Sequence, residues 1–329
     1  MAEPIEAQTE QTELEAWLDG IGLRLTEFLQ LPGDVSPRQY ARLSFEDGVT
    51  AILATYPPEV EAVCPRFLNT TALLEGVGVR VPRVLAAACD RGWMLVEDLG
   101  PRTLGDFRGR PWSELSAWFE QAIDLAERIA GLPAELVAGL NPPLGFELMK
   151  KELAQTWDLF LAPRELTGGP ALESALRAAL DEICAQLAAE TPAPCHRDFM
   201  ARNLMPLSGR AGGELAVLDH QDLRLGPPAY DLASLLNDTL FPPPELEEEL
   251  LARVPRIPRV HYHRAAAQRT LKAVGTYTSF ARRGAERHLP LIAPTLARCL
   301  DHLGRVPESA GLAGDLGRTW APVLQSSLE

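Results

Sequence analysis

A set of polar residues between apolar segments most strongly limits what this chain can fold into. It runs from His196 through Asp198 to Asn203, and the apolar stretch 215–218 then leads into Asp219. A carboxylate in such a loop can accept the proton of a substrate hydroxyl, while a carboxamide and a second carboxylate hold magnesium against nucleotide phosphates. Turn formation and helix capping are the ordinary roles of these residue types. The full spacing nevertheless favours a site for phosphoryl transfer from a nucleotide.

The segment 196–204, Asp219 and the triplet Asp231-Leu232-Ala233 resemble the aminoglycoside phosphotransferase family, a small-molecule branch of the protein-kinase-like fold. The resemblance implies that Asp198 is the catalytic base. It also implies that Asn203 and Asp219 bind Mg²⁺ and that ATP is the phosphoryl donor.

Two further residues around the loop receive structural roles. The resemblance implies that Asp231 braces the catalytic loop, which is compatible with the ordinary role of an aspartate as the N-cap of the helix that follows it. We expect His196 to bond the loop backbone rather than to act as a base.

The length of 329 residues allows two lobes with separate cores. The net charge of −14 argues against nucleic acid or an anionic membrane as the main partner, because proteins bind both through clusters of Lys and Arg. The first residues lack the basic and apolar regions of a signal peptide. We therefore expect a cytoplasmic monomer that acts on a small molecule.

The five cysteines are odd in number and widely spread, and no two of them form a Cys-x-x-Cys pair. That pattern favours reduced thiols over a disulfide framework or a zinc site.

Hydrophobic periodicity and turn residues predict strands early in the chain and helices later. The expected β-hairpin turns at Asp47-Gly48, and strands are expected at 79–85 and 93–97. Helices are expected at 12–30, 59–76, 112–132, 146–160, 170–189, 246–254 and 262–304, the last broken at Pro290. Gly20-Ile21-Gly22 is a candidate break in the first of them. The predicted class is α+β: a bilobal kinase-like fold with a small β-rich N-lobe (1–98) and a larger helical C-lobe (99–329).

In the resembling family the hairpin lies over the nucleotide phosphates. The hairpin residues with which this chain would contact phosphate are Ser36, Arg38, Tyr40 and Arg42. The alternative is an exposed hairpin with solvated arginines. The family's adenine-binding hinge corresponds to Glu97–Leu99, with Glu97 and Leu99 as the pairing residues, unless this segment is a plain exit from a strand.

One departure from the kinase pattern limits the resemblance to one branch of the family. A kinase-like N-lobe normally has a phosphate-binding lysine, but the three lysines of this chain are Lys150, Lys151 and Lys272. A Ser-x-Arg-x-Tyr-x-Arg hairpin followed by a lysine-free strand resembles the cell-wall sugar kinase branch. That branch phosphorylates the anomeric hydroxyl of N-acetylmuramic acid and N-acetylglucosamine in peptidoglycan recycling.

Four residues are candidates for binding the acceptor. Gln221 and Asp222 follow the metal-binding aspartate and can hydrogen-bond sugar hydroxyls. Glu152 lies on a helix that lines the acceptor pocket in the sugar kinases, and Arg224 is a candidate for the lactyl carboxylate of N-acetylmuramic acid. Helix capping by Asp222 and ordinary solvent exposure of Gln221 and Glu152 are the alternatives.

The motifs leave other functions open. They also serve aminoglycoside, choline and homoserine kinases, and Asp222 or Glu152 would suit a cationic acceptor as well as a sugar. The missing N-lobe lysine allows a nucleotide-binding pseudokinase that acts as a scaffold, although Asp198, Asn203 and Asp219 are all retained.

Overall fold

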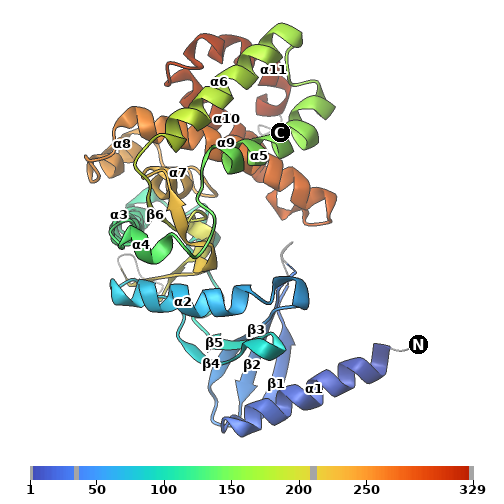
Figure 1. Cartoon of the computed structure of the whole chain (residues 1–329). Coiled ribbons are helices and arrows are strands. Elements are labelled where there is room, and N and C mark those ends of the chain that lie inside the picture. The colour runs from blue at the N-terminus through green and yellow to red at the C-terminus, as the bar shows by residue number, and fades with distance from the viewer. Residues whose placement is uncertain (1–2, 33–36, 208–212, 326–329) are drawn as a thin grey trace. The chain divides into compact units, whose positions relative to one another are not determined.

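The structure, a computed structural model, describes residues 3–32, 37–207 and 213–325 (Figure 1). Contacts within the chain define two compact units. The first comprises Met1–Ala72 with Val81–Gly100, and the second comprises Leu73–Arg80 with Pro101–Glu329. A sheet dominates the first unit and helices dominate the second, so the predicted α+β class is confirmed.

The first unit contains a five-stranded antiparallel sheet in the order β1-β2-β3-β5-β4. Its strands are β1 (Leu25–Gln30), β2 (Gln39–Phe45), β3 (Thr50–Thr55), β4 (Val84–Ala88) and β5 (Trp93–Glu97). Alternate residues of a strand point to opposite faces. On one face, Leu53 and Leu95 of the central strands pack with Leu14 and Leu18 of α1 (Glu3–Gly20).

The neighbouring residues of the same strands form the core of the other face. Ala54 and Met94 pack there with Tyr56 and with Phe67 of α2 (Val63–Gly76). The central strands are therefore buried on both faces by two helices that flank the sheet.

The predicted hairpin is confirmed by β2 and β3. The Asp47 Oδ1 atom accepts a hydrogen bond of 3.0 Å from the Val49 amide, and Gly48 has a φ of +79°. Such a left-handed conformation strongly favours glycine or asparagine. The Asp-Gly pair therefore fixes the turn, and the turn fixes the register of the two strands.

The helix predicted over 12–30 is wrong in its second half. The helix α1 ends at Gly20, and Leu25–Gln30 forms the edge strand β1, which pairs with β2. The segment Gly20-Ile21-Gly22 ends the helix, and Gly22 has a φ of +81°. Apolar residues in a short segment satisfy either period, and here pairing with a neighbouring strand decided the outcome.

The expectation of reduced thiols is wrong for two of the five cysteines. Cys64 and Cys89 form a disulfide with a Cα–Cα distance of 5.6 Å. Cys64 lies in the first turn of α2, and Cys89 begins the 3₁₀ turn between β4 and β5. The fold brings together residues that the sequence separates, whereas Cys184, Cys195 and Cys299 are buried free thiols.

The second unit is mainly helical. Its α-helices are α3 (Trp112–Ala130), α4 (Ala134–Val137), α5 (Phe146–Thr156), α6 (Pro170–Ala188), α7 (Tyr230–Leu236), α8 (Pro244–Ala252), α9 (Arg259–Arg282), α10 (Ile292–Gly304) and α11 (Ala313–Gln325). Two short antiparallel pairs join β6 (Ala193–Cys195) to β9 (Arg224–Gly226) and β7 (Leu204–Pro206) to β8 (Leu215–Val217). These pairs frame the predicted catalytic loop.

Most of the predicted helices are confirmed. The expected break in 262–304 lies between α9 and α10, where Gly284 has a φ of +90° and Pro290 stands in a 3₁₀ turn. The terminal helix α11 was not predicted. In the described part of the chain, no helix combines the length and the apolar composition that crossing a membrane requires.

The long helix α9 is the central element of this unit. It packs against α5, α6, α7 and α10, and Figure 1 shows it among them. At Gly275 it passes so close to α5 that a Cβ atom would lie 2.2 Å from Thr156 Oγ1. The Thr156 hydroxyl donates a hydrogen bond of 2.9 Å to the Leu271 carbonyl oxygen. This close crossing fixes α9 against α5.

Candidate active site

The loop between β6 and β7 contains the predicted catalytic base, Asp198, and the predicted metal ligand Asn203. The Asn203 side-chain amide donates a hydrogen bond of 2.8 Å to the backbone oxygen of Asp198. The Asn203 backbone amide closes the turn by donating to the Met200 oxygen at 2.8 Å. These two bonds fix the turn between Asp198 and Asn203.

Asp231, in the first turn of α7, fixes the backbone just before Asp198. Its carboxylate accepts hydrogen bonds from the amides of His196 at 2.6 Å and Arg197 at 2.9 Å. Burial raises the pKa of Asp231 to about 6, although the His196 side chain and the two amides favour the anion. Arg197 has a φ of +76°, and Ser234 Oγ donates to its carbonyl oxygen at 3.2 Å. The unusual backbone at Arg197 is thus held by α7.

His196 is fully buried. Its Nε2 atom lies 2.8 Å from the Leu218 carbonyl oxygen, and its ring makes an edge contact with Phe199. These contacts join the predicted catalytic loop to the segment that precedes Asp219. They suit the structural role expected from the sequence.

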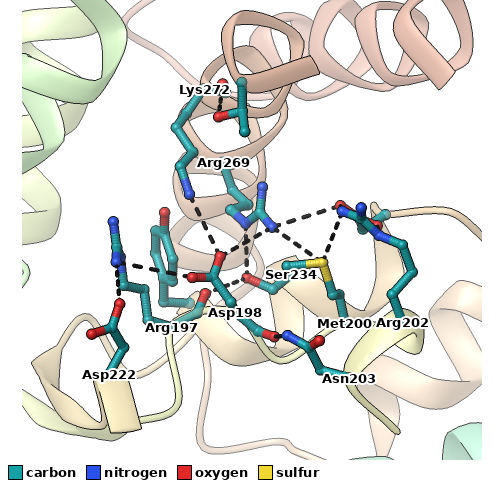
Figure 2. A network of polar contacts seen from close by, with 12 residues as sticks. Arg197, Asp198, Met200, Arg202, Asn203, Asp222, Ser234, Arg269 and Lys272 are labelled. Atoms are coloured by element: carbon teal, nitrogen blue, oxygen red, sulfur yellow. Dashed lines mark hydrogen bonds and ion pairs between the residues drawn. The ribbon is translucent and has the colours of Figure 1, made fainter. Parts of the chain in front are cut away.

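Three cations surround the Asp198 carboxylate (Figure 2). Its nearest oxygens lie 3.5 Å from Lys272 Nζ, 3.6 Å from Arg269 Nη2 and 3.9 Å from Arg197 Nη1. Burial alone would raise the pKa of Asp198, but the charges of Lys272, Arg197 and Arg269 outweigh it and hold the pKa well below its usual range. The side chain keeps 22% of its exposure. Asp198 is therefore an accessible carboxylate that stays ionised.

Two of these cations lie on α9 and were missed by the sequence analysis. Arg269 Nε donates to Ser234 Oγ at 3.1 Å, and Arg269 Nη2 lies 3.6 Å from the buried carboxylate of Asp238. Asp238 also accepts a hydrogen bond of 2.7 Å from the Tyr277 hydroxyl. The available signal was a basic pair three residues apart in a stretch of mainly small and apolar residues, 265–275, since cations in such a stretch require anionic partners when they are buried.

Arg197 was also missed, and it joins two of the predicted acceptor-binding residues. Its Nη2 atom donates to Glu152 Oε1 at 2.7 Å and its Nη1 atom to Asp222 Oδ2 at 2.8 Å. Burial opposes the charge of Arg197, but Asp198 and Glu152 outweigh it and raise the guanidinium pKa. Both carboxylates therefore lie beside Asp198 and are already paired with a cation.

The other two predicted acceptor-binding residues, Gln221 and Arg224, contact different groups near Asp198. Gln221 Nε2 donates to Asp219 Oδ1 at 2.8 Å. Arg224 is buried and donates to the backbone oxygens of Asp222 at 2.9 Å and Pro142 at 3.2 Å. Gln221 thus contacts the predicted metal ligand, whereas Arg224 contacts the loop backbone.

The residues predicted to bind Mg²⁺ lie on adjoining segments, since the Leu218 amide donates to the Asn203 oxygen at 2.8 Å. Asp219 has a φ of +58°. Within the described ranges, no three acidic, histidine or cysteine side chains converge as metal ligands. A carboxylate and an amide oxygen suit Mg²⁺, which usually takes few protein ligands and completes its shell with phosphate and water. The donor set fits that ion.

The predicted nucleotide-binding residues lie in the first unit, except for Ser36, which is outside the described residues. The Arg38 guanidinium lies 5.9 Å from the centre of the Tyr40 ring. Arg42 donates two hydrogen bonds, of 2.6 and 3.1 Å, to the Asp98 carboxylate. Burial would raise the pKa of Asp98, but hydrogen bonds from Arg42 and from the Gly100 amide lower it.

The predicted hinge, Glu97–Leu99, begins at the end of β5. Glu97 is the last residue of this strand, and its amide donates to the Arg83 oxygen at 2.8 Å. The Glu97 carboxylate lies 3.3 Å from Arg83 Nε. Leu99 lies outside the strand and is partly exposed.

Residues 27–254 match the model of the phosphotransferase enzyme family. The chain is 31% identical over 304 residues to the N-acetylmuramate/N-acetylglucosamine kinase of Pseudomonas aeruginosa, covering 85% of this chain and 82% of the relative. It is 30% identical over 328 residues to the enzyme of the same name from Neisseria meningitidis, with 90% of each chain covered.

Solved structures show the same fold. Choline kinase LicA from Streptococcus pneumoniae matches with a TM-score of 0.63 and 15% identity, covering 90% of this chain and 99% of that one. The ADP-bound aminoglycoside phosphotransferase APH(2'')-Ib matches with a TM-score of 0.57 and 17% identity, covering 87% and 95%. The chain belongs to the phosphotransferase enzyme family, and the predicted kinase-like fold is confirmed.

Proposed function

We propose that this phosphotransferase uses ATP and Mg²⁺ to phosphorylate the anomeric hydroxyl of N-acetylmuramic acid, N-acetylglucosamine or both. The observation that most supports it is Asp198: an accessible carboxylate, kept ionised by three cations, within a braced loop. The names of the relatives support the choice of acceptor. The product is then a sugar 1-phosphate, which we assign to peptidoglycan recycling in the cytoplasm, and we propose that the enzyme acts as a monomer.

Asp198 acts by orienting the acceptor hydroxyl. Because its pKa lies well below the usual range, it is a weak base in the ground state. Phosphoryl transfer proceeds through a loose transition state, so the hydroxyl becomes acidic only late in the reaction. Asp198 then takes the proton that the forming phosphate ester releases. Asp231 and His196 keep the loop in place, and Mg²⁺ bound by Asn203 and Asp219 would neutralise phosphate charge.

The first unit supplies the nucleotide site in this proposal. Ser36, Arg38, Tyr40 and Arg42 contact the phosphates, and the backbone of Glu97 and Leu99 contacts the adenine edge. Arg42 already shares its charge with Asp98, which holds the guanidinium in a defined orientation. Arginine then takes the place of the lysine that is missing from this part of the sequence.

The acceptor site is formed by Glu152, Asp222, Gln221 and Arg224. Arg197 fixes the carboxylates of Glu152 and Asp222, whose remaining acceptor positions suit sugar hydroxyls. A cationic acceptor such as choline or an aminoglycoside would meet Arg197, Arg269 and Lys272 around Asp198. Repulsion by these like charges opposes the attraction of the nearby carboxylates, of which Glu152 and Asp222 are already paired with Arg197, so the site favours a neutral or anionic acceptor.

A coupled ADP-release assay with ATP and Mg²⁺ tests the proposal. The acceptors are N-acetylmuramic acid, N-acetylglucosamine, glucose, choline, homoserine and kanamycin. We expect turnover on the N-acetyl sugars, with loss of the reducing end in the product because the anomeric oxygen is blocked. Turnover on choline or kanamycin instead would contradict the acceptor assignment. ATP binding without turnover on any acceptor would favour the pseudokinase.

A further inference from the structure

Within the described part of the chain, Lys272 is a largely buried cation with one close acidic partner, Asp198. Its side chain is 12% exposed, and the Nζ atom lies 3.5 Å from Asp198 Oδ1. Among the described residues, no other carboxylate lies within ion-pair distance of Nζ. A lysine ammonium has three donors and is strongly hydrated in water, so a buried one requires more acceptors than this contact supplies.

The other two cations around Asp198 have additional partners. Arg269 donates to Ser234 Oγ and lies 3.6 Å from the Asp238 carboxylate, and Arg197 bridges Glu152 and Asp222. Burial lowers the pKa of Lys272, and the favourable charge of Asp198 does not fully restore it. Of the three cations, Lys272 therefore has the fewest partners for its charge.

The position of Lys272 places that anion on the acceptor side of Asp198. In Figure 2, Lys272 points down from α9 onto the Asp198 carboxylate, while Asn203 lies on the opposite side of Asp198. Asn203 is on the side assigned to metal and phosphates. Glu152 faces the same part of α9, because its Oε2 atom accepts a hydrogen bond of 3.4 Å from Gln268 Nε2, one turn before Lys272. Burial alone would raise the pKa of Glu152, and the Lys272 charge opposes that effect.

The two proposed acceptors differ at a single position. N-acetylmuramic acid bears a lactyl ether on O3, which ends in a carboxylate, and N-acetylglucosamine bears a hydroxyl there. When the anomeric hydroxyl donates its hydrogen bond to Asp198, the Asp198 carboxylate is shared between the substrate and Lys272. A second anion on the substrate then completes the surroundings of the ammonium.

We propose that Lys272 Nζ binds the lactyl carboxylate of N-acetylmuramic acid and determines the preference for this sugar over N-acetylglucosamine. This inference rests on the proposed function. It replaces Arg224 as the candidate for the lactyl contact, because Arg224 already donates to two backbone oxygens and lies 3.5 Å from the Asp222 carboxylate.

The test compares three acceptors that differ only at the lactyl group: N-acetylmuramic acid, its methyl ester and N-acetylglucosamine. The variants are Lys272→Met and Lys272→Arg, with Lys150→Met as the control. Lys150 is an exposed lysine of α5 that pairs with Asp181 at 2.8 Å. The measured quantities are kcat and KM for each sugar, and thermal melting confirms that each variant is folded.

We expect the wild type to prefer the free acid over its ester. Lys272→Met lowers the ratio of kcat/KM for the acid to that for N-acetylglucosamine by about 10- to 100-fold, chiefly through KM, and makes the acid no better than the ester. Lys272→Arg keeps most of the wild-type preference for the acid over N-acetylglucosamine, and Lys150→Met leaves that preference unchanged.

Equal loss of activity on all three sugars in Lys272→Met would overturn the inference, since the ammonium would then act on Asp198 or on the transferred phosphoryl group. The proposed function would survive that result. A wild type that phosphorylates neither N-acetyl sugar would overturn both. A wild type that phosphorylates the acid and its ester equally well would overturn the lactyl contact alone.

Discussion

At the scale of single residues, Asp198 is both the proposed reacting group and the shared anion of three cations. Its carboxylate contacts Arg197, Arg269 and Lys272. Replacing it with the isosteric amide keeps the shape but removes the charge. We therefore expect Asp198→Asn to lower kcat by about 10²- to 10⁴-fold, because an amide cannot accept the proton of the acceptor hydroxyl.

The same substitution should also lower stability, because it leaves the buried Arg269 and the largely buried Arg197 and Lys272 with one fewer anion. We expect a loss of about 1–3 kcal/mol in the free energy of unfolding, measured with urea. The control is Asp124→Asn, which removes an exposed carboxylate that pairs with Arg253 on the surface, and it should change stability by less than about 0.5 kcal/mol. Normal turnover by Asp198→Asn would refute its catalytic role.

How far the site could be predicted depends on how its residues are arranged in the sequence. Asp198, Asn203 and Asp219 follow one another closely, so their spacing alone indicated a function. Lys272 and Arg269 reach the same carboxylate from a helix far along the chain, and only the packing of α9 brings them there. Tertiary contacts of that kind leave almost no local signal. The sequence also could not show that Glu152 and Asp222 share Arg197.

At the scale of elements, the crossing of α5 and α9 determines where Glu152 and Lys272 lie. Gly275 permits that crossing, because a Cβ atom there would lie 2.2 Å from Thr156 Oγ1 and 2.7 Å from Thr156 Cα. Alanine is normally the better helix former by about 1 kcal/mol. At Gly275 we expect the reverse: Gly275→Ala should destabilise the protein by about 1–3 kcal/mol, since overpacking forces the helices apart.

Gly317 in α11 provides the matched control. A Cβ atom there would meet Leu300 Cδ2 at 3.5 Å, an ordinary contact, so Gly317→Ala should be neutral or stabilising. Urea unfolding of both variants measures the difference. Because Glu152 and Lys272 lie on the two crossing helices, Gly275→Ala should also raise KM for the acceptor. Equal stability effects in the two variants would show that the crossing tolerates a side chain.

The elements that the sequence predicted well are those with a strong local signal. The hairpin has Asp47-Gly48 at its turn, and the amphipathic helix from Trp112 is long enough for its period to be unambiguous. The segment Leu25–Gln30 was too short to distinguish a strand from a helix, and its partner β2 decided its structure. The pairing of Cys64 with Cys89 likewise depended on where α2 begins beside the β4–β5 connection.

At the scale of the whole molecule, global stability should depend on two histidines buried between α9 and α10. His263 Nδ1 lies 3.0 Å from His302 Nδ1, and His302 Nε2 lies 2.8 Å from Asn237 Oδ1. Burial lowers the pKa of His263 to about 4 and holds that of His302 well below its usual range. Arg298 and Arg305 disfavour protonation further, against weaker opposing effects of Asp301 and Glu248 on His263. Both histidines are neutral in the folded protein.

In the unfolded chain both histidines titrate near a pKa of about 6.5. Between that pH and the lower folded-state pKa values, the unfolded state binds more protons, so stability falls as the pH falls. We expect the pair to remove about 2–3 kcal/mol of unfolding free energy between pH 7 and pH 5.5. Other groups titrate as well, so the readout is the difference in this pH dependence between the wild type and the double variant His263→Gln, His302→Gln. The variant should be less stable at pH 7, because it loses buried hydrogen bonds, and should lose less on acidification. If the double variant has the same pH dependence as the wild type, the two histidines accept protons in the folded state. The conclusion that both are neutral there would then be wrong.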